Sequence, residues 1–304
     1  MERAPSNKAG LAAPSAGAVL ELLKPVTWFP PMWAFLCGAV SSGVAFGPNA
    51  GLVIAGMILA GPLSCGASQV VNDWFDREVD AINEPNRPIP SGRIPGEWGL
   101  WLAIAFTALA LIVAAALGPI VLAGASLGAA LSWAYSAPPL RFKLDGWLGP
   151  AAVAISYEGL TWFTGAALLL GAFPDAHILA LAGLYSAGAH GVMTLNDFKA
   201  IEGDRRMGVR SLPVRYGPET AARIACWVMA VPQVVVILLL FAWGRPIHAG
   251  VVTGFLLVQL LAMRRLVRDP ARHAPWYNGV GVSLYAFGML TAALAVASLG
   301  ETPA

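Results

Sequence analysis

The sequence of 304 residues is 57% hydrophobic and only 12% charged, with a mean hydropathy of +0.66. Soluble domains carry about 25% charged residues, so the composition excludes an ordinary soluble protein and predicts a polytopic membrane protein. The formal net charge of +2 gives no indication of a nucleic-acid partner.

The first 20 residues are rich in Ala, Ser, Gly and Pro and lack the apolar core of a secretory signal. We expect residues 1–20 to form a disordered cytoplasmic arm and residues 21–304 to form a single transmembrane domain. Nine apolar runs in that domain are long enough to cross a bilayer. They span residues 26–46, 50–71, 97–117, 119–137, 147–169, 178–195, 220–242, 247–265 and 276–299. The sequence therefore predicts an all-α membrane protein with nine helices.

The distribution of basic residues predicts the orientation of these helices. Short loops on the cytoplasmic side of a membrane retain Lys and Arg. With nine helices, and with Arg223 at the start of the seventh, every Lys and Arg except Arg245 falls on the side of the N-terminus. We therefore expect the N-terminus in the cytoplasm and the C-terminus outside.

An acidic stretch ends the second predicted helix. Asn72, Asp76 and Asp80 recur every four residues, so their side chains lie along one helical face. Stacked carboxylates repel one another, and the helix C-terminus is itself negative, so the arrangement needs a cation. Oxygen ligands favour Mg²⁺, which typically shares its coordination with substrate phosphate and water. The alternative is a solvated loop whose acids pair with nearby arginines.

A second acidic stretch ends the sixth predicted helix and contains Asn196, Asp197 and Asp204. Aligned with the first stretch, it has Ala200 where the middle carboxylate stands. A weak internal duplication would explain the two stretches, and repeats of this kind bring matching ends together at a functional site.

Two other acids are near enough to replace the missing one. By helical periodicity, Asp197 and Glu202 point away from the face of Asn196. A bend in the chain is therefore required to use either of them, and Gly203 is a candidate position for that bend.

Basic residues follow the predicted helices at the same end and suit a diphosphate ligand, since Arg binds phosphate in a bidentate manner. Retention of positive charge in cytoplasmic loops is the alternative explanation. Arg87 and Lys199 are the strongest candidates because they lie within the acidic stretches. The full set is Arg87, Arg93, Arg141, Lys143, Lys199, Arg205, Arg206 and Arg210.

Three parts of the sequence together resemble the UbiA-type superfamily of intramembrane prenyltransferases, over about residues 20–300. They are the Asn72-x-x-x-Asp76-x-x-x-Asp80 pattern, the second stretch ending at Asp204, and the segment Tyr-Ser-Ala-Pro-Pro at 135–139. Residues 80–93 and 196–204 are similar to the chlorophyll synthase branch. The short N-terminus and the lack of loop cysteines resemble its bacteriochlorophyll synthase members.

The resemblance implies a central cavity that opens to a cytoplasmic active site in the bacterial inner (intracytoplasmic) membrane. It also implies a Mg²⁺-dependent prenyltransferase that moves geranylgeranyl or phytyl from its diphosphate to the propionate of bacteriochlorophyllide a. Its partners would be these two substrates, the lipid bilayer and pigment-biosynthesis or photosystem-assembly proteins. The implied Mg²⁺ ligands are Asn72, Asp76, Asp80 and Asp204, with Asn196 as a further polar position; Asp197 joins them as the substitute for the acid absent at 200.

The implied reaction requires no general base, because a propionate is already ionised near pH 7. The enzyme must instead ionise the allylic C–O bond and exclude water. We expect Asp76, Asp80, Arg87 and Lys199 to be catalytic. We expect the substrates to contact Arg87, Arg93, Tyr135, Arg141, Lys143, Glu158, His190, Lys199 and Arg205.

Two of these residues lie inside predicted spans, where ionisable groups are candidates for functional sites. Glu158 is expected to face the central cavity. His190 is expected either to ligate the magnesium of the chlorin or to pack as a hydrogen-bonded histidine.

Two other functions fit parts of this pattern. A related prenyltransferase could use chlorophyllide, haem, hydroxybenzoate or homogentisate as its acceptor. A cation-coupled transporter would instead place its acids near the bilayer midplane, whereas here the two richest acidic clusters lie at helix ends beside basic loops.

Overall fold

Helices provide the regular structure of the chain. The computed structural model describes residues 13–299, and within that range β pairing is limited to one bridge between Asp145 and Arg210. Eight helices are long and apolar enough to span a membrane, and Phe29–Ser41 is a shorter apolar helix. The predicted all-α architecture with nine helices is confirmed, because each predicted run overlaps one of these segments.

The spanning segments carry the following bounds in chain order: α2 (Phe29–Ser41); α3 (Phe46–Ile58) continued by η3 (Leu59–Cys65) and α4 (Gly66–Asn83); α5 (Trp98–Leu117); α6 (Pro119–Ser136); α7 (Leu148–Ala154) continued by η5 (Ile155–Gly159) and α8 (Leu160–Leu170); α9 (Ala176–Thr194); α12 (Pro218–Ala242); α13 (Pro246–Arg268); and α14 (Pro270–Ala297). The shorter helices are α1 (Ala16–Leu22), η2 (Pro25–Thr27), η4 (Phe142–Leu144), η6 (Asp197–Lys199), α10 (Ile201–Met207) and α11 (Leu212–Tyr216).

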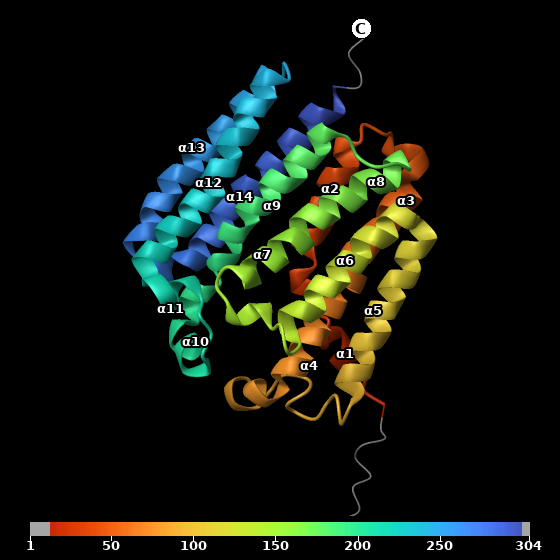
Figure 1. Cartoon of the computed structure of the whole chain (residues 1–304), viewed down its shortest axis with the longest axis vertical. Helices are drawn as coiled ribbons and strands as arrows, with labels where there is room; N and C mark the ends of the chain where they lie inside the picture. The colour runs from red at the N-terminus through yellow and green to blue at the C-terminus, as the bar shows by residue number, and fades with distance from the viewer. Residues whose placement is uncertain (1–12, 300–304) are drawn as a thin grey trace, which may run out of the picture.

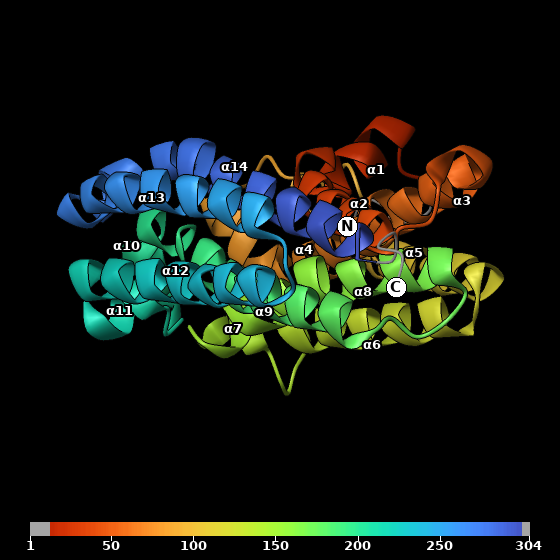
Figure 2. The same ribbon diagram turned by 90° about the horizontal axis from the view of Figure 1, so that it is seen from above.

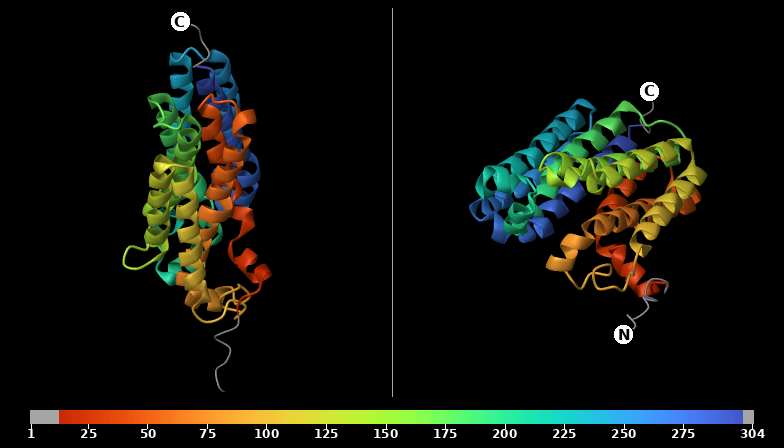
Figure 3. Two further views of the ribbon diagram at one scale, coloured as in Figure 1. Left: turned by 90° about the vertical axis from the view of Figure 1, so that its right-hand side faces the viewer. Right: turned by 60° about the horizontal axis from the view of Figure 1, so that its bottom comes forward.

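The helices run side by side along the long axis of the molecule (Figure 3). Seen from above, α13, α14 and α2 lie over α12, α9 and α8 (Figure 2). The end of α4 lies with α1, α10 and α11 at the lower end of Figure 1, whereas α3 and the last turns of α14 lie at the upper end. The two acidic stretches, which end α4 and follow α9, are therefore at the same end of the bundle.

Close helix packing holds the centre of the bundle together. A Cβ on Gly38 of α2 would lie 1.9 Å from the carbonyl oxygen of Trp162, and one on Gly165 of α8 would lie 2.1 Å from that of Phe35. Only glycine permits this approach, as is common where membrane helices cross. Trp162 stacks on Tyr185 with ring centroids 5.6 Å apart. Buried aromatic rings therefore pack next to the crossing of α2 and α8.

The prediction of a disordered arm is wrong for the last residues of residues 1–20. Residues 16–20 belong to α1, where the Ser15 hydroxyl accepts a hydrogen bond from the backbone N–H of Ala18 at 3.3 Å. Ala18 and Leu22 are buried against Val70 and Val71 of α4, and this apolar contact explains why the segment folds. Residues 1–12 lie outside the described part of the chain.

Candidate functional site

The first acidic stretch lies on one uninterrupted helix, α4. Asn72 and Asp76 share a face as predicted, and the Asn72 amide donates a hydrogen bond to Asp76 Oδ2 at 3.1 Å. Asp76 Oδ1 lies 2.5 Å from Lys143 Nζ, which comes from the loop after α6. Burial lowers the pKa of Lys143, and the charge of Asp76 opposes that shift. The predicted need for a cation is met here by a lysine of the chain.

The charge of Asp80 is neutralised by Arg87, which lies in the loop after α4. Arg87 Nη1 lies 2.8 Å from Asp80 Oδ2 and 3.5 Å from Asp73 Oδ1, while its Nε lies 2.6 Å from Glu84. Asp73 is only 1% exposed and also accepts a hydrogen bond from Lys24 Nζ at 2.7 Å. Arg87 therefore joins two carboxylates of α4 to the loop that follows this helix.

Asp73 and Lys24 were missed by the sequence reading, which considered only the face shared by every fourth residue. A signal was present, since positions 73 and 80 are seven apart and lie on one helical face. Lys24 could not be found in this way, because it is 49 residues from Asp73. It adopts a left-handed backbone with φ of 47°, a conformation that is uncommon for residues other than glycine.

The second acidic stretch does bend, although not at Gly203. Helix α9 ends at Thr194, a single turn η6 holds Asp197, and α10 begins at Ile201. Asp197 and Asp204 interact electrostatically with each other across the end of η6 and the start of α10. Asp204 is partly buried, and this burial raises the pKa of its carboxyl.

Glu202 does not take the place of the missing acid. Its carboxylate lies 3.3 Å from Arg205 Nη1 and 3.1 Å from Arg206 Nε, and all three side chains are exposed. Arg205 is therefore paired on the outer surface of α10. Asp197 and Asp204 are left as the acids of the second stretch that turn inward.

Tyr135, at the end of α6, shows that the two stretches converge. It interacts electrostatically with Asp76 of the first stretch. It also interacts with Asp197 and Asp204 of the second. A cavity of about 430 Å³ begins at this point, and Asn72, Tyr135 and Asn196 all line it. The expected meeting of the two acidic ends is thus present in the fold.

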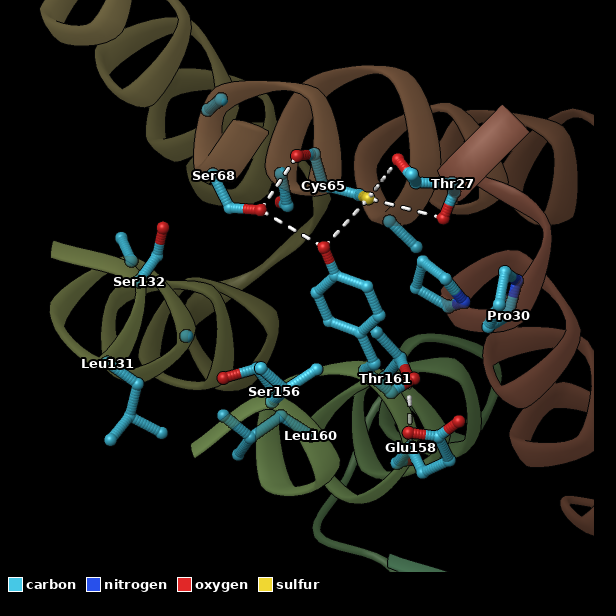
Figure 4. Close-up of a pocket in the computed structure, with 18 of the residues that line it drawn as sticks. Thr27, Pro30, Cys65, Ser68, Leu131, Ser132, Ser156, Glu158, Leu160 and Thr161 are labelled. Carbon is cyan, nitrogen blue, oxygen red and sulfur yellow. Dashed lines mark hydrogen bonds between the residues drawn. The ribbon is translucent and has the colours of Figure 1, made fainter. Parts of the chain in front are cut away.

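Most of this cavity is apolar and extends between the helices, with lining residues from η2, from α2 to α9 and from α14, including the π-helical segments η3 and η5. Its volume is in the range of small-molecule sites. Figure 4 shows residues that line it from several helices, including Cys65, Ser68, Ser132 and Leu160. The arrangement suits a ligand with one highly charged end and a long apolar part.

The loop between α6 and α7 is held against the second stretch. The backbone N–H of Gly146 donates to the carbonyl of Arg210 at 3.0 Å, and the N–H of Arg210 donates to Leu144 at 2.9 Å. Asp145 lies 3.3 Å from Arg215. Backbone N–H groups at the start of α7, beginning with that of Trp147, lower the pKa of Asp145. These contacts fix the loop that carries Lys143.

Three of the predicted basic residues have different surroundings. Arg141 adopts a left-handed backbone with φ of 41°, and its buried Nε has no hydrogen-bond partner among the residues that the structure describes. Lys199 is exposed and makes no ion pair within residues 13–299. Arg93 forms a two-bond contact with Glu21 of α1 at 2.5 and 2.8 Å, so the structure directs it to α1 and does not bring it to the cavity.

Glu158 and His190 differ in their position relative to the cavity. Glu158 lies in η5 and lines the cavity, as expected. His190 is 9% exposed, and its Nε2 lies 3.1 Å from the carbonyl oxygen of Trp147. Its ring also packs 5.3 Å from that of Trp147. His190 is not among the described residues that line the cavity, so the structure favours the packing alternative.

The donor set is suitable for a hard divalent ion. Asn72, Asp76, Asp80, Asn196, Asp197 and Asp204 supply oxygen ligands only. No group of three or more His, Cys, Asp or Glu in residues 13–299 is arranged to enclose a metal ion by itself. Mg²⁺ is usually held by one or two carboxylates and completes its shell with water and phosphate oxygens, so an open donor set of this kind fits it.

Comparison with known proteins places this geometry in a family. Residues 27–285 match the UbiA prenyltransferase family. The chain is 57% identical to the bacteriochlorophyll synthase 33 kDa chain of Cereibacter sphaeroides, covering 96% of this chain and 97% of the relative. It is 40% identical to the chloroplastic chlorophyll synthase of Oryza sativa, covering 91% and 76%.

Solved structures agree on the fold. A UbiA homologue from Archaeoglobus fulgidus, bound to GPP and Mg²⁺, aligns with a TM-score of 0.72 at 19% identity, covering 90% of this chain and 99% of the homologue. A structure concerned with digeranylgeranylglyceryl phosphate synthase aligns with a TM-score of 0.71 at 20% identity, covering 91% and 98%. The resemblance in the sequence is therefore confirmed, and the chain belongs to the UbiA prenyltransferase family.

Proposed function

We propose that this chain transfers a geranylgeranyl or phytyl group from its diphosphate to the propionate of bacteriochlorophyllide a. The observation that carries the proposal is that Asn72 and Asn196, one from each acidic stretch, line one largely apolar cavity together with Tyr135. The choice of acceptor is supported by relatives named bacteriochlorophyll synthase, among them the chain of Rhodobacter capsulatus at 56% identity over 93% of this chain.

The reaction breaks the allylic C–O bond, and the electron pair of that bond leaves with the diphosphate. A propionate oxygen supplies the pair for the new ester bond. Because the propionate is already ionised near pH 7, no protein group has to remove a proton. The chain's contribution is to bind the charged leaving group, hold the acceptor carboxylate in line and exclude water.

Asn72, Asp76, Asp80, Asn196, Asp197 and Asp204 are proposed to hold Mg²⁺ together with the substrate. Mg²⁺ would neutralise the oxygens of the diphosphate. Lys143 and Arg87 already lie at 2.5 and 2.8 Å from Asp76 and Asp80. They are fixed cations beside the place where charge develops on the leaving group, an arrangement that contributes strongly to catalysis. Lys199, which makes no ion pair with any residue in the described range 13–299, is proposed to contact the diphosphate directly.

The site is proposed to open to the cytoplasm of a bacterial inner membrane. Every Lys and Arg except Arg245 falls on one side of the predicted topology, and Arg245 is tied to the carbonyl oxygen of Ser298 at the opposite end. By the preference for positive cytoplasmic loops, the N-terminus lies in the cytoplasm and the C-terminus outside. Association with pigment-biosynthesis or photosystem-assembly proteins is part of the same proposal.

Purified protein supplied with Mg²⁺ and geranylgeranyl diphosphate tests the acceptor. Bacteriochlorophyllide a, chlorophyllide, haem, hydroxybenzoate and homogentisate are offered separately, and the products are separated by chromatography. We expect esterified bacteriochlorophyllide and a much slower reaction with the other acceptors. Absence of the esterified pigment, with product from another acceptor, would refute the proposal while leaving the family unchanged.

A further inference from the structure

Glu158 lies on a local widening of its helix. Residues 155–159 form the π-helical segment η5 between α7 and α8, and a second π-helical segment, η3, faces the same cavity. Single π turns inside α-helices are frequent at functional sites. The widening adds a residue to the turn and brings Glu158 to the cavity wall, as Figure 4 shows.

The neighbouring tyrosine fixes this segment. Tyr157 Oη accepts a hydrogen bond from Gln69 Nε2 at 3.0 Å and one from Cys65 Sγ at 3.1 Å. Ser68 Oγ lies 3.1 Å away, and because its own proton is donated to the carbonyl of Cys65 at 2.8 Å, it accepts from Tyr157. The hydroxyl is thus fully used, so Tyr157 anchors η5 to α4 and has no capacity left for a ligand.

The anchor also sets the depth of Glu158. Residues 65–69 precede Asn72 by one to two turns of helix, which corresponds to about 5–10 Å along the axis. Glu158 therefore lies deeper in the cavity than the acidic stretches. It is also the eleventh of the 23 residues in the span Leu148–Leu170, close to the middle of the membrane.

The carboxyl of Glu158 has no internal partner in the part of the chain that the structure describes. Its backbone carbonyl accepts a hydrogen bond from Thr161 at 3.3 Å, but no ion pair or hydrogen bond reaches its side chain there. Asp76 and Asp80, by contrast, each contact a cation. An unpaired charge at this depth costs several kcal/mol, so the carboxyl is stable there only in its neutral form, which offers one O–H donor.

We propose that Glu158 selects the acceptor by donating a hydrogen bond to a carbonyl oxygen on the edge of the macrocycle. A prenyl chain is a hydrocarbon and has no group to receive this bond, whereas the ring carbonyls of a bacteriochlorin do. With its propionate at the acidic end, the ring extends toward the level of η5. The inference rests on the proposed function, because it takes the acceptor from it.

Three forms of the full-length protein test the role of this side chain. Glu158→Leu removes the hydrogen bond, Glu158→Gln retains a donor without a charge, and Glu219→Leu on the exposed start of α12 is the matched control. Bacteriochlorophyllide is titrated into each protein without prenyl diphosphate, and both the dissociation constant and the long-wavelength absorption band of the bound pigment are recorded. The KM for geranylgeranyl diphosphate is measured separately.

We expect Glu158→Leu to weaken pigment binding about 10-fold, in keeping with the loss of one hydrogen bond, and to shift the absorption band. Glu158→Gln should stay within about threefold of wild type, and the KM for the diphosphate should not change. Unchanged affinity and band position in Glu158→Leu would overturn the inference. A higher KM for the diphosphate with unaltered pigment binding would overturn it as well.

A substrate-side experiment uses the wild-type protein and does not depend on how well a variant folds. Pigment whose peripheral carbonyls have been reduced fully to methylene groups, which accept no hydrogen bond, is compared with the intact pigment. Wild type should bind the reduced pigment about 10-fold more weakly, and Glu158→Leu should bind both equally. If wild-type protein binds the two pigments equally, the proposed hydrogen bond is refuted but the proposed function is not. Wild-type protein that neither binds nor esterifies bacteriochlorophyllide refutes the proposed function, and the inference with it.

Discussion

Lys143 Nζ lies 2.5 Å from Asp76 Oδ1, so a loop 67 residues away in sequence supplies the counterion for the central carboxylate of the first acidic stretch. The ion pair is partly buried, with the lysine side chain 11% exposed. In the proposed reaction, a cation fixed in this position would stabilise negative charge on the departing diphosphate. The pair therefore connects the fold of the α6–α7 loop to the chemistry of the site.

Replacing Lys143 with Met should lower kcat/KM for geranylgeranyl diphosphate by at least about 100-fold, the loss typical of one preorganised group that stabilises transition-state charge. Lys143→Arg keeps the charge and should lose less. Steady-state assays with both substrates measure the effect. Arg272→Met, at the exposed start of α14, is the control for removing one positive charge at the same end. Equal activity of Lys143→Met and Arg272→Met would contradict the assignment.

The dependence of activity on Mg²⁺ should be lost when the carboxylates of the first acidic stretch are replaced. Asp76→Asn and Asp80→Asn each remove a carboxylate that we propose as a Mg²⁺ ligand, so both variants should lose turnover. Binding of Mn²⁺ in the presence of a prenyl diphosphate, followed by electron paramagnetic resonance, should weaken in parallel. Asp175→Asn, which alters the cap of α9 at the other end of the bundle, should bind the metal normally. Near-normal activity in both motif variants would refute the site.

The second stretch offers a matched pair of acids only two positions apart. Asp204 is partly buried, whereas the exposed Glu202 pairs with Arg205 and Arg206 on the surface. We expect Asp204→Asn to reduce turnover by at least about 100-fold, since it removes charge from the proposed metal site. Glu202→Gln should stay within about twofold, because exposed ion pairs contribute little. The opposite ranking in the same assay would show that α10 presents its other face to the substrate.

The sequence could predict the spanning helices because a bilayer offers the backbone no hydrogen-bonding partners, so long apolar runs must be helical. It could also predict that Asn72 and Asp76 share a face, since helical periodicity is local. It could not predict that His190 contacts the carbonyl of Trp147, 43 residues away. The break after Thr194 was expected at Gly203, but that glycine lies within α10, so its presence was not a sufficient signal.

Asp73, which lies off the face shared by every fourth residue, is a positioning residue because of its partners Lys24 and Arg87. Asp73→Asn leaves Lys24 without its counterion and Arg87 with one carboxylate of α4 in place of two. Removing one partner of a buried ion pair typically costs about 3–5 kcal/mol. We expect lower thermal stability in detergent and a raised KM for the prenyl diphosphate.

Glu84→Gln is the control for this variant. It removes another contact of Arg87, but at an exposed position, and should therefore have a smaller effect on both measurements. Wild-type stability and an unchanged KM in Asp73→Asn would show that Arg87 is held adequately by Asp80 alone.

A buried amide pair joins α12 to α13 away from the site. Gln233 and Gln259 are both 0% exposed, and each amide donates to the other's oxygen, at 3.1 and 3.0 Å. Replacing either one with Leu leaves the other amide without this partner, which should cost about 1–3 kcal/mol. Replacing both removes the unsatisfied groups together, so the double variant should lose less than the sum of the single losses.

Reversible unfolding of the two single variants and the double variant in mixed micelles gives the coupling energy directly. We expect the two losses to be non-additive by about 0.6 kcal/mol or more, the average for hydrogen bonds between membrane helices. Thr253→Val is the control on α13, because its hydroxyl bonds to the Ala249 carbonyl of its own helix. Strict additivity would mean that the two amides contribute to packing and not through their mutual hydrogen bonds. Catalytic activity should follow stability in all these variants, since neither glutamine lines the cavity described above.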